Sequence, residues 1–181
     1  MAEADLPAVR EIDATIESAE YLHLHREGEG LSLVWKIEPR RLRQARVHRH
    51  AMDDETSFAV KQILTGVEEG IALVAEHADS IAAAAAARPD AAAGIMRLID
   101  LRVDFDFRRQ GLASGLLFQI IHEARQRNLR AVAAQTLSDD FPAAQLLTKL
   151  NFELTGFDTH NKTNHDLVKD SVVVFWYLQL N

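Results

Sequence analysis

The stretch Arg108-Arg109-Gln110-Gly111-Leu112-Ala113, which we call the glycine loop, decides the fold because it joins a strand pattern to a helix pattern. Residues 95–103 alternate in a way that predicts a central strand, and apolar side chains after the loop recur at helical spacing. Gly111 permits a close backbone approach at the helix start, where unpaired amides and the helix dipole favour an anion. Because Arg108 and Arg109 can bond phosphate oxygens, the glycine loop is predicted to hold a pyrophosphate.

The same six residues also fit a plainer interpretation, a strand-to-helix turn with a basic surface. They do not form a Walker loop, because no Gly-Lys-Ser or Gly-Lys-Thr follows them. They also lack the Gly-x-Gly-x-x-Gly of dinucleotide-binding proteins. The rest of the chain must therefore decide between a turn and an anion site.

Length, composition and charge exclude several classes of protein. A chain of 181 residues predicts one domain, or one domain with a small extension, and its net charge of −7 argues against a nucleic-acid partner. The absence of cysteine excludes disulfide frameworks, thiolate metal sites and a cysteine nucleophile. No apolar run is long enough to cross a membrane, and the first residues lack the pattern of a signal peptide. A cytoplasmic protein without a membrane partner is the expectation.

The first third of the chain is predicted to contain a hairpin and a helix. Residues 6–20 favour a helical or irregular entry segment. Alternating residues 21–25 and 31–37 flank Gly28-Glu29-Gly30, which predicts a hairpin that Pro39 closes. Residues 40–54 are expected to be loop with some helix. Apolar positions from Phe58 to Val67 follow at roughly helical spacing.

An alanine-rich stretch follows a short apolar run, residues 71–75, which is expected to end in a turn at Asp79. Residues 82–87 are six alanines, which favour a helix by intrinsic propensity. Their position between two strand-like segments, and the Arg88-Pro89-Asp90 that stops them, favour a buried strand instead. We predict a strand, with the helix as the alternative.

The chain after the predicted helix alternates again between strand and helix. Residues 131–134 predict a short strand, and Ser138-Asp139-Asp140 can cap a second helix with Pro142 in its first turn. Asn151 is suited to a left-handed stop at the end of that helix. Residues 152–157 and 172–180 predict two more strands, so the chain has an α/β, mixed-sheet pattern.

Several segments in this order resemble the GNAT acetyltransferases. Arg108-x-x-Gly111-x-Ala113 is similar to the Gln/Arg-x-x-Gly-x-Gly/Ala element of that superfamily, and the strand at residues 98–103 and the Asp106-Phe107-Arg108 approach fit it too. Residues 143–152 resemble its Ala-x-x-Phe-Tyr-x-Lys-x-Gly-Phe helix. Arg127-Asn128-Leu129, Phe157-Asp158-Thr159 and Phe175-Trp176-Tyr177-Leu178 resemble the streptothricin acetyltransferase branch. The first 90 residues contribute little to the resemblance.

The resemblance implies a fold, a cofactor and its binding residues. The fold would be a mixed, mostly antiparallel sheet of about six to seven strands flanked by helices. Residues 1–181 would form one domain, with residues 1–69 on the acceptor side and residues 70–181 as the acetyl-CoA-binding core. Backbone groups of Leu101 and Val103 would bind the pantetheine arm in a groove between the strands ending near Val103 and starting near Ala131, and Asp140 would also contact the cofactor. The pyrophosphate would be held by Arg108, Arg109, Gln110, Gly111, Leu112, Ala113 and Ser114.

The positions expected to move protons do not carry the usual residues. Acetyl transfer to an amine needs a base, a donor for the oxyanion and an acid for the leaving thiolate. Related enzymes often have Glu, Glu and Tyr where this chain has Ile99, Gln135 and Leu147. The candidate catalytic residues are therefore Asp100 and Tyr177. Each has a structural alternative, a hydrogen-bonded carboxylate for Asp100 and core packing for Tyr177.

A second group of residues is predicted to bind the acceptor or to move protons near it. His165, and more weakly His23 and His25, are further candidates, while Trp35 has core packing as its alternative. His48 and His50 have neither a helical nor a finger spacing of metal ligands, so they predict a solvated surface and no metal site. The predicted acceptor-binding residues are Trp35, Gln135, Asp158 and His160.

Two function hypotheses follow, with a purely structural α/β domain as a weaker third. The first is an N-acetyltransferase that uses acetyl-CoA and an amine acceptor, either a small molecule such as an aminated antibiotic or a protein amine. The second is a non-catalytic acyl-CoA-binding regulatory module that lacks the proton-transfer groups. Acidic stretches would suit a cationic acceptor, although such runs are usually solvated faces. The apolar C-terminal strand offers an edge for a homodimer.

Overall fold

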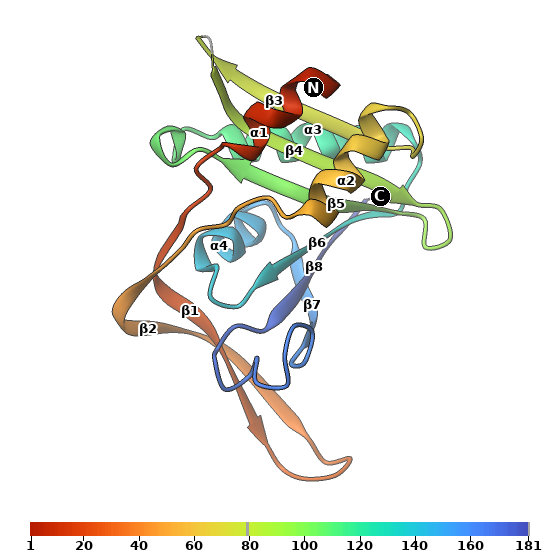
Figure 1. Cartoon of the computed structure of the whole chain (residues 1–181). Helices are drawn as coiled ribbons and strands as arrows, with labels where there is room; N and C mark the ends of the chain where they lie inside the picture. The colour runs from red at the N-terminus through yellow and green to blue at the C-terminus, as the bar shows by residue number, and fades with distance from the viewer. Residues whose placement is uncertain (79, 181) are drawn as a thin grey trace. The chain divides into compact units, whose positions relative to one another are not determined.

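The structure is a computed structural model that describes residues 1–78 and 80–180, and it has the predicted α/β architecture (Figure 1). Its contacts divide the chain into two compact units. The first unit consists of Met1–Thr15, Arg49–Ala134 and Tyr177–Asn181. The second unit consists of Ile16–His48 and Gln135–Trp176. The assignment of residues 1–69 to the acceptor side and residues 70–181 to the cofactor side stays a prediction.

The main sheet has six strands in the order β3-β4-β5-β6-β8-β7, and a separate sheet pairs β1 with β2. In the first unit, β3 (Ile71–His77), β4 (Ser80–Asp90) and β5 (Ile95–Val103) form an antiparallel meander. Strand β6 (Ala131–Leu137) begins beside β5 and runs parallel to it. The mixed sheet predicted from the sequence is therefore confirmed.

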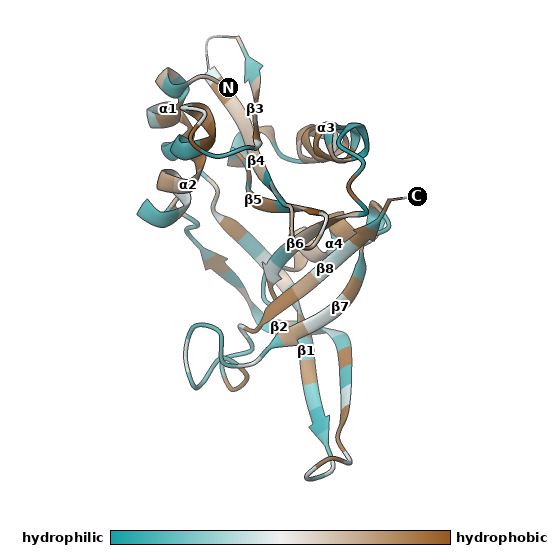
Figure 2. Ribbon diagram, turned by 90° about the vertical axis from the view of Figure 1, so that its right-hand side faces the viewer, coloured by the Kyte–Doolittle hydropathy of each residue, from teal (hydrophilic) through white to brown (hydrophobic). Residues whose placement is uncertain are grey.

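Helices cover both faces of the meander in the first unit. Figure 2 shows α1 (Leu6–Arg10) and α2 (Asp54–Leu64) on one face of β3, β4 and β5, and α3 (Leu112–Gln126) on the other. Asp53 caps α2 by accepting a hydrogen bond from the Thr56 N–H at 2.7 Å. Helix α3 buries one apolar face against the strands, while its other face is exposed, as its spacing predicts.

The alanine run forms β4, so the strand interpretation is confirmed and the helix alternative is wrong. Ala83–Ala87 are all at most 3% exposed, because helices approach β4 from both sides. The predicted stop at residues 88–90 is wrong, since β4 continues to Asp90. Pro89 pairs with Met96 of β5, but the pairs between β4 and β3 end at Ala87. The missing N–H of Pro89 therefore interrupts no hydrogen bond to β3.

The predicted hairpin is present in the second unit, but it is longer than expected. Strand β1 (Ile16–Glu27) pairs with β2 (Val34–His48), so the loop predicted from Arg40 onward is wrong up to His48. Pro39 does not close the hairpin, because it lies within β2 opposite Leu22. A proline is tolerated there because both strands of a two-stranded sheet have a free edge. The register shifts between Ser18 and Glu20.

The remaining elements of the second unit follow the predicted order. Helix α4 (Phe141–Lys149) is capped by Asp140, whose carboxylate accepts a hydrogen bond from the Ala143 N–H at 3.1 Å. Asn151 ends the helix in the predicted left-handed conformation, with φ of 62°. Strand β7 (Glu153–Asp158) follows, and β8 (Val173–Gln179) closes the chain. Helix α4 packs against β1.

Other expectations differ at their ends. The helical or irregular segment predicted for residues 6–20 ends early, because β1 begins at Ile16. Val67 lies beyond α2, since Gly66 adopts a left-handed φ of 72° after the helix. The turn predicted at Asp79 lies outside the described residues. Within residues 1–78 and 80–180, no helix combines the length and the apolar character needed to cross a membrane.

Candidate functional site

The segment between β5 and the glycine loop is anchored at its first two residues by hydrogen bonds within the first unit. The Asp104 N–H donates to Ala82 at 2.9 Å, and the Phe105 N–H donates to the Asp13 carbonyl at 2.9 Å. In return, the Asp13 N–H donates to the Asp104 carboxylate at 3.1 Å. The start of the short helix η2 (Phe105–Phe107) is thereby held near the first residues of β4. The turn before the glycine loop is therefore held in a defined conformation by these hydrogen bonds.

Arg108 of the glycine loop also interacts with this turn through its charge. Hydrogen bonds from the Thr15 hydroxyl and N–H hold the pKa of Asp13 below its ordinary value, and the positive charges of Arg49 and Arg108 lower it further. Arg108 also donates from Nε to the Val103 carbonyl at 3.3 Å. Its guanidinium lies 5.2 Å from the centre of the Phe105 ring, which is within the range of a cation–π contact. Arg108 therefore supports the loop as well as carrying charge.

The glycine loop has the backbone conformation that its sequence predicts. Gly111 has φ of 86° and stands at the N-cap of α3, where it supplies no side-chain acceptor. Arg109 is also left-handed, with φ of 61°. A Cβ added to Gly111 would meet nothing within 4 Å, so the space beside it is open. The first-turn amides of α3 therefore have no side-chain cap, and the helix dipole makes this end suited to an anion.

Strand β5 has a free edge where the pantetheine arm was expected. Its pairs with β6 run from Ile95 to Arg97 and, among the described residues, go no further. The pairs with β4 continue to Val103 but shift in register, with Ala87 opposite Leu98 and Ala86 opposite Asp100. Ile99 is thus the extra residue of a β-bulge. Residues 98–103 are paired on one side only, which leaves backbone groups on the other side for a ligand.

Asp100, a predicted catalytic residue, is engaged in a buried ion pair. Arg102 donates from Nε to Asp100 Oδ2 at 2.7 Å and from Nη2 to Oδ1 at 2.8 Å. The side chains of Asp100 and Arg102 are only 7% and 1% exposed. A carboxylate held in this way is closed to solvent and to an amine. The geometry therefore favours the structural interpretation of Asp100, and its catalytic role stays a prediction.

Tyr177, the other predicted catalytic residue, lies on β8 and contacts Arg130, the residue before β6. Its hydroxyl is hydrogen-bonded to Arg130, whose guanidinium also lies 5.6 Å from the centre of its ring. Arg130 in turn donates to the carbonyls of Ala93 and Gly94, just before β5 begins. The glycine loop follows the opposite end of β5. The structure therefore does not bring Tyr177 to the glycine loop, and its catalytic role stays a prediction.

Three of the predicted acceptor-binding residues lie near one another in the second unit. Trp35 is the second residue of β2 and is only half-buried, so it is not a core residue. Its ring meets Phe157 of β7 edge-on, with the ring centres 4.9 Å apart. Asp158 follows Phe157 and accepts a hydrogen bond from the His160 N–H at 2.9 Å. Trp35 makes the aromatic contact with Phe157, and Asp158 and His160 lie next to Phe157 in the chain.

Gln135, the fourth predicted acceptor-binding residue, is exposed on β6. Its neighbour Thr136 accepts a hydrogen bond from Trp176 Nε1 at 2.9 Å. His165 is also exposed, in the segment between β7 and β8. No contact joins these residues to Trp35 or Asp158 among the interactions of the described residues.

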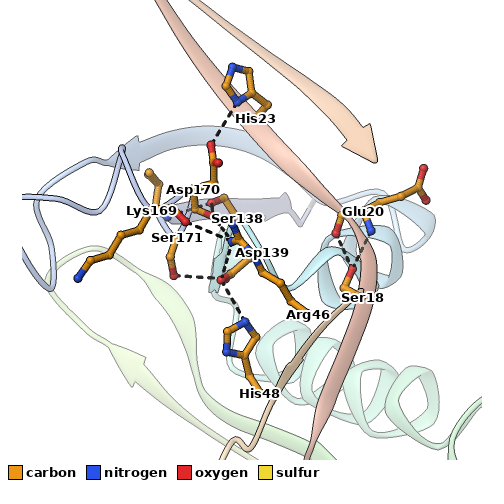
Figure 3. Close-up of polar contacts among 11 residues, drawn as sticks. Ser18, Glu20, His23, Arg46, His48, Ser138, Asp139, Lys169, Asp170 and Ser171 are labelled. Atoms are coloured by element: carbon orange, nitrogen blue, oxygen red, sulfur yellow. Dashed lines mark hydrogen bonds and ion pairs between the residues drawn. The ribbon is translucent and has the colours of Figure 1, made fainter. Parts of the chain in front are cut away.

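A polar cluster that the sequence did not predict surrounds Asp139 in the second unit (Figure 3). The Asp139 side chain is only 6% exposed, and its Oδ2 lies 3.5 Å from both Arg46 Nη1 and His48 Nε2. Ser171 donates to its other oxygen at 3.3 Å. His48 is exposed, as predicted, but it is also the imidazole beside this carboxylate. A buried carboxylate next to an accessible imidazole can take part in proton transfer.

The cluster continues through Asp170 on the same side of the hairpin (Figure 3). Asp170 Oδ1 lies 3.2 Å from His23 Nδ1, and the Asp170 carbonyl accepts from the fully buried Ser138 hydroxyl at 3.0 Å. Arg46 donates to the carbonyls of Lys169 and Asp170. Alternating Arg46 and His48 could have indicated a shared face, had their segment been recognised as a strand. Among the described residues, no group of three or more His, Cys, Asp or Glu side chains is arranged to hold a metal ion.

A family comparison gives this geometry its context. The sequence pattern of the acetyltransferase (GNAT) family matches residues 33–152. The chain belongs to the GNAT family. None of the curated protein sequences compared with this GNAT chain matches it. The resemblance expected from the glycine loop and the helix at residues 143–152 is therefore confirmed.

Solved GNAT structures share the fold at low sequence identity. A protein described as a streptothricin acetyltransferase from Bacillus anthracis strain Ames, in complex with acetyl coenzyme A, is 17% identical, with a TM-score of 0.78 over 100% of this chain and 95% of its own. A nourseothricin acetyltransferase is 15% identical, with a TM-score of 0.81 over 100% and 96%. The ribosomal-protein-S18-alanine N-acetyltransferase of Escherichia coli is 18% identical, with a TM-score of 0.66 over 100% and 91%.

The three positions that GNAT enzymes often use for proton transfer carry residues without a titratable side chain in this chain. Ile99 packs against the apolar cluster that α1 and α2 form with β4. Leu147 is 3% exposed on α4 and belongs to the core. Gln135 is the only one of the three that is exposed to solvent. None of these side chains can exchange a proton near neutral pH.

The segment between β7 and β8 contains a carboxylate with a shifted pKa. The Thr163 hydroxyl donates to Asp166 at 2.6 Å and the Lys162 N–H donates to it at 2.8 Å, which together hold the pKa of Asp166 below its ordinary value. Such a carboxylate stabilises the fold above its unfolded pKa of about 4, and the contribution is lost as the pH falls through the folded pKa. Asp166 therefore makes this segment sensitive to acid.

The variant Asp166→Asn tests this contribution to stability. The amide keeps the shape of the side chain but not its charge, so we expect the variant to unfold at a lower temperature than the wild type at neutral pH. The difference should shrink as the pH falls from about 4 through the lower pKa of the folded state, because the folded wild-type carboxylate becomes protonated over that range. Thermal unfolding followed by circular dichroism across pH measures both effects. A difference that stays constant across this range would contradict the assignment.

Proposed function

We propose that this GNAT protein transfers an acetyl group from acetyl-CoA to an amine acceptor, and that the glycine loop holds the pyrophosphate of the cofactor. The observation that carries the proposal is the left-handed Gly111 at an uncapped start of α3, with open space beside it. The amides of this turn, together with Arg108 and Arg109, supply the donors and the charge that a pyrophosphate needs. The structural relative from Bacillus anthracis, solved with acetyl coenzyme A, supports the same cofactor.

The free edge of β5 suits the rest of the cofactor. Backbone groups of Leu101 and Val103 lie in the segment that is paired with β4 alone, so they are suited to bind the amide groups of the pantetheine arm. Asp140, which caps α4, is proposed as a further cofactor contact. Bound acetyl-CoA would supply an activated thioester. The protein would orient it, and a neutral amine would replace the thiolate, which leaves with a proton.

The acceptor is proposed to be an amine on a small molecule or on a protein. Solved relatives include acetyltransferases for streptothricin, for nourseothricin and for a ribosomal protein. Trp35, Asp158 and His160 in the second unit offer an aromatic surface beside a carboxylate, which suits a cationic amine. Gln135 is proposed as a further acceptor contact because it is exposed on β6.

A second candidate function is a non-catalytic acyl-CoA-binding module. It is favoured by Ile99, Gln135 and Leu147 at the positions that often carry Glu, Glu and Tyr, and by the engagement of Asp100 with Arg102. This candidate and the enzyme share the cofactor but differ in turnover. They can therefore be separated by one pair of measurements.

The first measurement is calorimetric titration of the full chain with acetyl-CoA, with acetyl-pantetheine as the control ligand that lacks the pyrophosphate. Saturable binding of acetyl-CoA alone supports the site, and no binding of either would overturn both candidates. The second measurement follows thiol release with a panel of polyamines, amino sugars and peptides with free amines. Release with any acceptor supports the enzyme, whereas tight binding without release supports the module.

Arg109→Gln tests the charge of the glycine loop. Because Arg109 is exposed, we expect little loss of stability but about tenfold weaker acetyl-CoA binding, the effect of losing one charge-assisted hydrogen bond. The salt dependence of binding should also become shallower, since one positive charge fewer faces the anion. Arg125→Gln, at the exposed far end of α3, is the matched control and should bind like the wild type. Equal affinities for the two variants would remove Arg109 from the site.

A further inference from the structure

The part of β5 that is proposed to bind the cofactor is hydrogen-bonded to a neighbouring strand on one side only. Residues 98–103 contain the bulge at Ile99 and have strand partners only in β4. A strand paired on one side has half of the hydrogen bonds that hold a central strand in place. A segment like this needs another restraint if its backbone is to present a defined row of groups to a ligand.

The buried pair of Asp100 and Arg102 lies in this one-sided segment. The two residues are two positions apart and stand opposite Ala86 and Ala84 of β4, so they share a face of the sheet. The small alanines leave room for the guanidinium and the carboxylate to meet in two parallel hydrogen bonds. Such a bidentate pair has a defined orientation, and here it spans the peptide units on either side of Leu101.

Stability alone does not account for the pair. Burying two charges costs free energy that their attraction only partly offsets, and apolar residues at such positions are often at least as stable. Arg102 Nη1 is also buried without a hydrogen-bond partner among the described residues, which adds to the cost. A costly pair is therefore maintained next to the backbone that is expected to bind the pantetheine arm.

We propose that Asp100 and Arg102 are positioning residues that hold residues 98–103 of β5 in the conformation that binds the pantetheine arm. They act through the backbone of Leu101 and Val103 and do not touch the substrate. The pair also restrains the strand leading to Val103, whose carbonyl accepts from Arg108 of the glycine loop. This inference rests on the proposed function for its ligand, but the restraint itself can be measured without any ligand.

The test replaces the pair by apolar residues of similar volume, in Asp100→Leu/Arg102→Met. Amide hydrogen exchange of the unliganded full chain should become at least about tenfold faster at residues 98–103 and stay unchanged at residues 95–97. Calorimetry should show acetyl-CoA binding weakened by at least about tenfold. Arg102→Lys keeps the charge but loses the two-pronged geometry, so it should shift both measurements in the same direction. It also serves as the test variant if the double variant does not fold.

Two controls separate positioning from general loss of stability. Asp90→Asn/Arg97→Met removes a partly exposed pair on the half of β5 that β6 supports, and Val132→Ala destabilises the core beside that same half, on β6. Both should keep the wild-type affinity and the wild-type exchange at residues 98–103. Unchanged exchange in the pair variants would overturn the restraint, and faster exchange with unchanged affinity would overturn positioning. If the wild type binds no acetyl-CoA, the proposed function fails while exchange still decides the restraint.

Discussion

Replacing Gly111 by glutamate should raise the dissociation constant for acetyl-CoA by at least about 100-fold. Gly111 has φ of 86°, a conformation that costs about 1–2 kcal/mol for a residue with a Cβ. The larger effect comes from the ligand, because the new side chain occupies the open space beside the loop and brings a negative charge toward a pyrophosphate. Calorimetric titration of the variant with acetyl-CoA measures the loss.

The control for this variant is Gly66→Glu in the same unit. Gly66 has φ of 72° and, like Gly111, no atom within 4 Å of an added Cβ. The two variants should therefore lose similar stability in thermal unfolding, while only Gly111→Glu loses binding. Wild-type affinity in Gly111→Glu would remove the glycine loop from the cofactor site, and equal losses in the two variants would point to a general effect on the fold.

Arg102→Met should lower the free energy of unfolding by about 3–5 kcal/mol, because it leaves the Asp100 carboxylate buried without its partner. Met fills a similar volume, so the loss comes from the uncompensated charge rather than from a cavity. Chemical denaturation of the unliganded protein measures the effect. The matched control is Arg97→Met on the same strand, which breaks the partly exposed pair with Asp90 and should cost at most about 1 kcal/mol.

The double variant Asp100→Leu/Arg102→Met separates the charge from the packing. It should regain most of the stability that Arg102→Met loses, because no charge stays buried without a partner. A double variant as unstable as the single one would mean that the shape of the pair, rather than its charge balance, holds this part of β5. The stability measurement does not depend on acetyl-CoA and so stands apart from the proposed function.

Much of the fold could be predicted from local pattern. The glycine loop, the alternation before it and the helical spacing after it correctly predicted β5 and α3. These patterns are clear because the two elements pack against each other, so each has apolar side chains on the face that it buries. Strand β2 was cut short at Pro39, since proline indicates a strand end unless the strand has a free edge. Whether a strand has such an edge depends on partners that are distant in sequence.

The candidate site could be predicted only where all of its residues lie in one short segment of the sequence. The conformation of Gly111 follows from the six residues of the glycine loop. The cap at Asp140 likewise follows from its own short segment before α4. The sequence allowed a hydrogen-bonded Asp100 but did not predict its buried pair with Arg102, because alternation places Arg102 on the same face but does not show that both are buried. Asp139 meets Arg46 and His48 across about ninety residues of sequence, a contact that local pattern does not predict.

The alanine strand β4 has a consequence for how the chain folds. As a free segment, residues 82–87 prefer a helix, since alanine has the highest helical propensity. The native partners of β4 lie in β3 and β5, so the segment becomes extended only when these neighbours dock. Local preference and final structure are therefore in conflict at the centre of the first unit. We expect transient helix to form early here and to unwind before the central strand is in place.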